Sequence, residues 1–187
     1  MLRFNKNESL VEHDILKEGF TFSVPLTLNS IINSLGNVIL QSFMNSFGSI
    51  TVAAISTAYR VDSIIMLPVM NLGAGISTIT SQNLGAGQKE RVKKGLYIGV
   101  VIMATVAFFM TIIVINFGGT LVALFGIEAE SVVIGKAFFR ALAMFYVLFS
   151  VSVAIRGYIQ GIGDVNFTTV VGMSSLAVRI AMSYMLR

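Results

Sequence analysis

Long uncharged segments alternate with short polar segments along this chain. Asp, Glu, Lys and Arg are absent from residues 19–59, 63–88 and 95–127, and each run exceeds the ~20 residues that a helix needs to cross a bilayer core. The pattern predicts an all-α integral membrane protein with about five transmembrane helices. A cytoplasmic polar segment is expected at residues 1–19, followed by a transmembrane bundle over residues 20–187. Its spans are expected at about 20–47, 53–84, 95–117, 133–160 and 167–186.

The second predicted span is longer than a straight crossing requires, and it contains Pro68. Because proline lacks a backbone N–H and clashes with the preceding turn, we expect a kink at Pro68, a tilt or a protruding end. Residues 85–94 are expected to form a polar basic connection to the third span. Gly118 and Gly119 are expected to begin the next loop.

The composition supports a membrane protein and excludes several other classes. Hydrophobic residues make up 55% of the 187 residues and charged residues 12%, against roughly 25% charged residues in a soluble domain. Cysteine is absent and His13 is the single histidine, which excludes disulfides and the usual zinc ligand sets. No catalytic pair or metal cluster falls within the spans, so we expect a protein that is not an enzyme. The basic residues are scattered between apolar spans, so no nucleic-acid partner is expected.

Lysine and arginine gather at one end of the predicted spans. With a cytoplasmic N-terminus, the inner segments contain Arg3, Lys6, Lys17, Lys89, Arg91, Lys93, Lys94 and Arg156. The outer loops at 43–52 and 118–132 contain neither residue type, although Lys136 and Arg140 oppose the bias. Because Lys and Arg favour the cytoplasmic side, the sequence predicts a multi-pass protein of the plasma or inner membrane with its N-terminus inside.

Amide side chains recur every four residues along the first predicted span. The stripe consists of Asn29, Asn33, Asn37, Gln41 and Asn45. Amides in hydrocarbon must find hydrogen-bond partners or face water. The stripe is therefore either a set of interhelical hydrogen bonds or the wall of a water-filled cavity. We favour the cavity, because five amides exceed what helix association needs, and Asn29, Asn33, Asn37 and Gln41 are the candidate substrate-binding residues.

Charged residues inside the spans are the other candidates, because intramembrane charges are rare and usually functional. Asp62 lies about nine residues into the second span and is a candidate ion-coupling residue; an interfacial ion pair is the alternative. Arg179 lies deep in the fifth span and is expected to have a carboxylate or carbonyl partner.

Four sequence blocks resemble one transporter family. They are QNLGAGQKERVK at residues 82–93, Pro25 early in the first span, the segment at 53–68, and RGYIQGIGD at residues 156–164. Together they resemble the multidrug and toxic compound extrusion (MATE) family, nearest its DinF-like branch. Taken by themselves, the glycines of these blocks indicate helix ends and close packing rather than a phosphate loop.

The resemblance implies a fold of twelve helices in two lobes, of which this chain would supply helices 7–11. It would then be an incomplete C-terminal lobe whose partners are the missing N-terminal lobe, the lipid bilayer and a small-molecule substrate. The implied function is a secondary antiporter that exports small, often cationic or amphipathic drugs against Na⁺ or H⁺ influx, with no other cofactor. Some family members have a coupling acid in the seventh and tenth helices. The first and fourth spans here have none, which puts cation binding in this lobe in doubt.

The sequence leaves two alternative functions open. A lipid or oligosaccharide flippase of the wider superfamily is expected to have more basic residues in its cavity than the amide stripe provides. A membrane scaffold without transport would keep the amide face dry.

Overall fold

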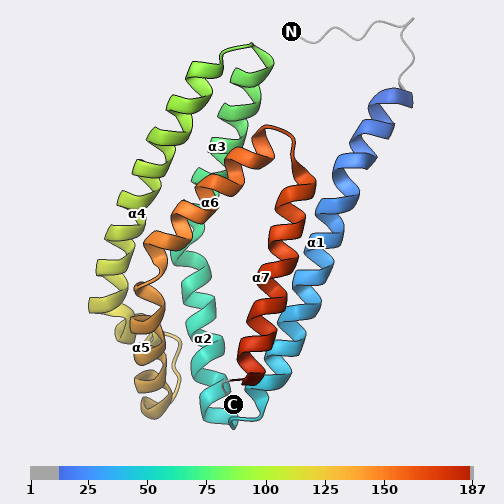
Figure 1. Ribbon diagram of the computed structural model, residues 1–187. Helices are drawn as coiled ribbons and strands as arrows, with labels where there is room; N and C mark the ends of the chain where they lie inside the picture. Colours follow the sequence, from blue (N-terminus) through green and yellow to red (C-terminus); the bar gives the residue numbers. More distant parts are fainter. Residues whose placement is uncertain (1–12, 186–187) are drawn as a thin grey trace, which may run out of the picture.

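A computed structural model describes residues 13–185 of the chain as a bundle of α-helices (Figure 1). Its elements are α1 (His13–Asn45), α2 (Ser49–Ile65), α3 (Leu67–Gly85), α4 (Lys89–Ala123), α5 (Ala129–Ala143), α6 (Tyr146–Gly161) and α7 (Val165–Met185). No β-strand occurs among the described residues, and the all-α prediction is confirmed. Residues 1–12 of the predicted polar segment lie outside the described residues, whereas residues 13–19 form the first turns of α1.

The helices follow the order of the five predicted spans, and two of the spans are bent. Helices α2 and α3 form one bent pair, with an angle of 44° between them, and α5 and α6 form another, with an angle of 55°. The chain direction reverses from span to span, so the start of α1, the α3–α4 turn and the α6–α7 turn lie at the same end (Figure 1).

The bend between α2 and α3 follows from the local sequence. Pro68 is in the first turn of α3, where it cannot donate the backbone hydrogen bond that would continue α2 through this point. Met66 separates the two helices. The kink predicted at Pro68 is confirmed.

The bend between α5 and α6 has no proline or glycine at its break, which falls at Met144 and Phe145. The N–H of Phe145 donates to the carbonyl of Leu142, three residues back rather than four. The Thr111 hydroxyl lies 2.9 Å from the carbonyl oxygen of Ala107 in its own helix α4 and 3.2 Å from the carbonyl oxygen of Ala143. A side chain that reaches a helix's backbone ladder in this way is a recognised cause of a kink.

The core is built around the unbroken helix α4, which packs against α3, α5 and α6. Phe139 of α5 is fully buried and lies against Gly118 of α4, where an added Cβ would come within 3.3 Å of it. Close packing of this kind explains why α4 continues through Gly118 and Gly119 to Ala123, instead of ending at the loop predicted there.

Helices α3 and α6 cross with their backbones in direct contact. A Cβ added at Gly157 would lie 2.3 Å from the Gly73 carbonyl oxygen, and one at Gly161 would lie 2.6 Å from the Ser77 carbonyl oxygen. Small residues at such crossings allow helices in membranes to approach closely. The interpretation of Gly157 and Gly161 as packing residues is confirmed.

Helix α1 packs mainly on α7, and the two run parallel. Leu176 of α7 is buried against Gly36, and the Thr169 hydroxyl lies 3.5 Å from the Pro25 carbonyl oxygen. The α1–α7 pair has few contacts with α2 and α6. The described chain therefore consists of two packed units, the α1–α7 pair and the α2–α6 bundle.

By length and composition, α4 and the two bent pairs are suited to cross a membrane among the described residues. Helices α1 and α7 match the first and fifth predicted spans in position, and their crossing of the membrane stays a prediction. The polar connection predicted at 85–94 is shorter than expected. The turn is completed at Gly87, with a positive φ of 71°, and α4 begins at Lys89.

Candidate functional site

An acid from one bent span meets a phenol from the other. Asp62 lies in the last turn of α2, and Tyr146 is the first residue of α6. The Tyr146 hydroxyl donates a hydrogen bond of 2.5 Å to Oδ1 of Asp62. We call this contact the elbow bond, because each of its residues borders the break in its own span. Tyr146 is 4% exposed, whereas Asp62 is partly exposed and open to a ligand.

A second polar contact between spans lies close to the elbow bond in the chain. It runs from the Thr111 hydroxyl to the carbonyl oxygen of Ala143, three residues before Tyr146. Ser150, one turn into α6, is fully buried and donates to the carbonyl of Val147. Polar groups inside a largely apolar bundle are costly unless they are paired. Their concentration at the two breaks makes this region the polar centre of the α2–α6 bundle.

A cation or proton that binds Asp62 must share the carboxylate with Tyr146. A carboxylate has about four lone-pair sites on two oxygens, and the elbow bond uses one of them. Among the described residues, no group of three His, Asp or Glu side chains is placed to hold a metal ion. Asp62 could therefore supply one charged ligand, and neutral oxygens or water would have to complete a cation site.

The predicted amide stripe on α1 is divided between two environments. Asn29 is partly buried on α7, where a Cβ added at Gly172 would come within 2.7 Å of its Nδ2 atom. Asn33 donates from Nδ2 to the backbone carbonyl and the side-chain oxygen of Asn29, one turn earlier. This end of the stripe contributes to helix contact.

The remaining amides are exposed. Asn37 and Gln41 face away from the packed surfaces, and Gln41 donates a 3.3 Å hydrogen bond to Asn45. No hydrogen bond joins the stripe to Asp62 in the part of the chain that the structure describes. The predicted site residues therefore form two separate groups, one on each packed unit.

A pocket of about 290 Å³ lies at the junction of the two units, between α6 and α7. Its walls include Ser152 and Arg156 of α6 and Phe167 and Thr168 of α7. It combines an apolar surface with one guanidinium group. In the sequence, Arg156 was notable only for the lysine and arginine bias and for the family resemblance. Its position in a pocket is known only from the structure.

Tyr146 was also missed by the sequence analysis. An aromatic residue in an apolar span has no periodic or charge signal that separates it from core packing. The one available signal was Asp62 itself, since a buried acid needs a donor, but the sequence does not show which donor.

The described fold and sequence match known proteins. A family model described as MatE matches residues 25–185. The probable multidrug resistance protein YoeA of Bacillus subtilis is 26% identical over 153 residues, which cover 82% of this chain and 33% of that protein. The probable multidrug resistance protein YpnP of the same organism is 28% identical over 149 residues, covering 80% and 33%. An FAD transporter of Shewanella oneidensis is 27% identical over 106 residues, covering 57% and 24%.

Solved structures share the fold. A crystal structure of MATE in complex with MaD3S matches with a TM-score of 0.83 and 19% identity, covering 89% of this chain and 38% of that chain. A MOP superfamily transporter from Pyrococcus furiosus, whose reported feature is reverse polarity of the binding pocket, also matches with a TM-score of 0.83 and 19% identity, covering 89% and 37%. The chain spans about a third of the length of these relatives.

Proposed function

This chain belongs to the MatE family, and from that premise we propose that it forms part of a secondary antiporter in the cell membrane. The antiporter exports small, often cationic or amphipathic compounds in exchange for Na⁺ or H⁺. The family match over residues 25–185 carries the proposal, together with the two relatives named as probable multidrug resistance proteins. Since the chain covers a third of those relatives, the complete transporter includes a further lobe as its partner.

Two features of the chain support alternating access, in which a central site opens to one side of the membrane at a time. The α1–α7 pair and the α2–α6 bundle have few contacts with each other, so one can move relative to the other with little loss of packing. Broken helices near a binding site are typical of secondary transporters, and both breaks here lie at the elbow bond.

Asp62 is suited to ion coupling because a cation or proton bound to its carboxylate competes with the Tyr146 hydroxyl for the same group. A proton or Na⁺ on the carboxylate weakens its attraction for the Tyr146 hydroxyl, and loss of the elbow bond frees the two breaks from each other. Ion binding would then change the relative angle of α2 and α6. The exposed amides Asn37 and Gln41 are the side chains that we assign to substrate contact.

The test is dye efflux by cells that express the complete transporter. Accumulation of a cationic fluorescent dye is followed while the proton gradient or the Na⁺ gradient is collapsed in turn. We expect accumulation to rise when one of the two gradients is lost. Efflux that continues after both gradients are collapsed would show that transport is not coupled to either ion.

A second candidate function is movement of a phosphate-bearing lipid or oligosaccharide, and Arg156 is the observation that favours it. This guanidinium lines the pocket between the two units, and Arg suits bidentate binding of phosphate. An Arg156→Gln variant separates the two functions. It should leave cationic dye efflux intact if drugs are the substrate, and should abolish flipping of a fluorescent phospholipid if lipids are.

A further inference from the structure

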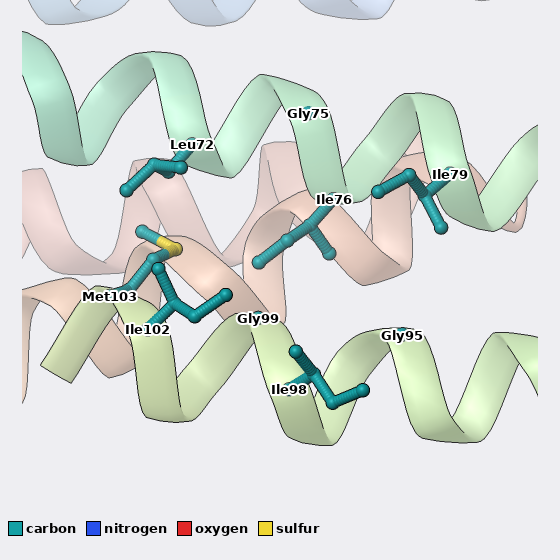
Figure 2. Close-up of a pocket in the computed structure, with 9 residues that line it drawn as sticks. All are labelled: Leu72, Gly75, Ile76, Ile79, Gly95, Ile98, Gly99, Ile102 and Met103. Atoms are coloured by element: carbon teal, nitrogen blue, oxygen red, sulfur yellow. The ribbon is translucent and has the colours of Figure 1, made fainter. Parts of the chain in front are cut away.

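A groove of about 280 Å³ runs between α3 and α4, away from the elbow bond and the amide stripe. Figure 2 shows Leu72, Ile76 and Ile79 of α3 facing Ile102 and Met103 of α4 across it. Gly95 and Gly99 form part of the α4 wall, and Gly75 part of the α3 wall. The groove is almost entirely apolar, and several of its isoleucines are about half exposed.

The groove is long enough to hold most of a lipid tail within one leaflet. The α4 wall extends from Gly95 to Met103, or about 12 Å at the helical rise per residue. One leaflet of the hydrocarbon core is roughly 15 Å deep. Because α4 is suited by length and composition to cross a membrane, we expect its exposed face to be available to acyl chains.

Basic side chains lie beyond one end of the groove. Arg91 precedes Gly95 by four residues and Gly99 by eight, so all three fall on the same face of α4. Lys94 is one turn before Ile98, another wall residue. Both basic side chains are exposed.

Lys93, in contrast, lies on the opposite face of α4. Its Nζ atom is 3.4 Å from Oε1 of Glu90, and this is the one ion pair found within residues 13–185.

We propose that this groove binds one acyl chain of an anionic phospholipid whose headgroup is held by Arg91 and Lys94. The four-residue offset places the Arg91 backbone about 6 Å beyond Gly95 along α4, at the depth where a headgroup follows its tail. Charge complementarity selects an anionic lipid over a zwitterionic one. The site is on the end of the bundle that also contains the start of α1 and the α6–α7 turn, the end that the lysine and arginine bias places in the cytoplasmic leaflet.

The test is native mass spectrometry of the full chain, purified in the presence of equal amounts of phosphatidylglycerol and phosphatidylcholine. We expect one retained phosphatidylglycerol, favoured over phosphatidylcholine by roughly tenfold or more, because two basic side chains contribute to the difference. The double variant Arg91→Gln and Lys94→Gln should lose this preference. The matched control Lys93→Gln removes the same type of charge from the other face and should keep it.

A second pair of variants tests the tail. Gly75 and Gly85 both have open space where a side chain would project, but Gly75 lines the groove and Gly85 does not. Gly75→Leu should lower retention of phosphatidylglycerol at an unchanged melting temperature, and Gly85→Leu should not. Equal retention of the two lipids by the wild-type chain, or retention of neither, would overturn the proposal. So would a preference that survives both the double charge variant and Gly75→Leu.

Discussion

Tyr146 donates its hydroxyl hydrogen to Asp62 across 2.5 Å, and the two residues lie beside the breaks of the two bent helix pairs within residues 13–185. One break follows a proline, and the other lies beside an interhelical threonine contact. The elbow bond joins the residues beside the two breaks, so a change at this one bond affects both bends. The contribution of the bond to stability can be measured directly.

Tyr146→Phe should lower the free energy of unfolding by about 1.5–3 kcal/mol, the usual range for a hydrogen bond to a charged group. The ring and its packing are retained, so the loss reports on the hydroxyl. Thermal unfolding in detergent measures it. Tyr158→Phe on the same helix is the control, since no side-chain hydrogen bond of Tyr158 is found among the described residues. Equal melting temperatures for the two variants would show that the elbow bond is not formed in solution.

Asp62→Asn keeps the shape of the side chain and removes its charge. If Asp62 couples ion flow to export, this variant should lose gradient-driven efflux while substrate binding stays measurable. Dye efflux and equilibrium dye binding by the complete transporter, measured together with the melting temperature of the same variant, separate coupling from stability. Wild-type efflux by Asp62→Asn would assign Asp62 to a structural role only.

The two ends of the amide stripe should respond differently to loss of the amide. Asn37→Leu changes an exposed position, so the chain should fold normally while efflux falls because the substrate loses a hydrogen-bond partner. Asn29→Leu changes a contact with Gly172 and should lower the melting temperature. Asn33→Leu should fall between them, because Asn33 is bonded to Asn29.

Asn116→Leu is the control for these variants, since Asn116 is an exposed amide on α4 and should tolerate leucine in both assays. If Asn37→Leu keeps wild-type efflux at a normal melting temperature, the exposed half of the stripe does not contact substrate.

Gly157→Ala should destabilise the fold by about 1–3 kcal/mol, the usual effect of overpacking. Its new Cβ would meet the backbone oxygen of Gly73 at 2.3 Å, and backbone cannot move aside as a side-chain end can. Gly75→Ala is the matched control, because it has open space at the Cβ position. That control should be neutral or stabilising by up to about 1 kcal/mol, as expected for Gly→Ala within a helix. Comparable stability for both variants would contradict the close crossing of α3 and α6.

Thr111→Val should remove the hydroxyl from the carbonyl of Ala143 while keeping the side-chain shape. We expect a loss of about 1 kcal/mol, together with faster amide hydrogen exchange around Phe145. Thr105→Val is the comparison, since Thr105 bonds only within α4, to Val101. If exchange near Phe145 is unchanged, the 55° bend does not depend on Thr111.

The two bends show how far the sequence could predict this fold. The kink near Pro68 was predictable because its cause is a proline at the break. The bend at Met144 and Phe145 was not, because no proline or glycine marks it, and the contact beside it comes from Thr111 on another helix, which local sequence cannot place. Long apolar runs likewise predicted the order of the spans, whereas helix ends such as Lys89 and Ala123 depend on packing and turn geometry.

The candidate site was predictable to the same degree. Spacing placed Asn29 and Asn37 on one face of one helix, and the intramembrane charge drew attention to Asp62. What spacing could not show is that Asn29 meets Gly172, or that Asp62 meets Tyr146. Both contacts join residues on different spans, and a single sequence does not contain that information.

The parallel packing of α1 on α7 has a consequence for biosynthesis. Thr169 and Pro25, which meet in this contact, are 144 positions apart in the chain. A ribosome that inserts the spans in order releases α1 long before α7 exists, so the amides of α1 enter the membrane without their final neighbour. During this interval the Asn29 side chain keeps its hydrogen bond from Asn33 within α1 but lacks its packing against Gly172. Mutations that weaken α7 should therefore act first on the yield of inserted protein, before any effect on transport.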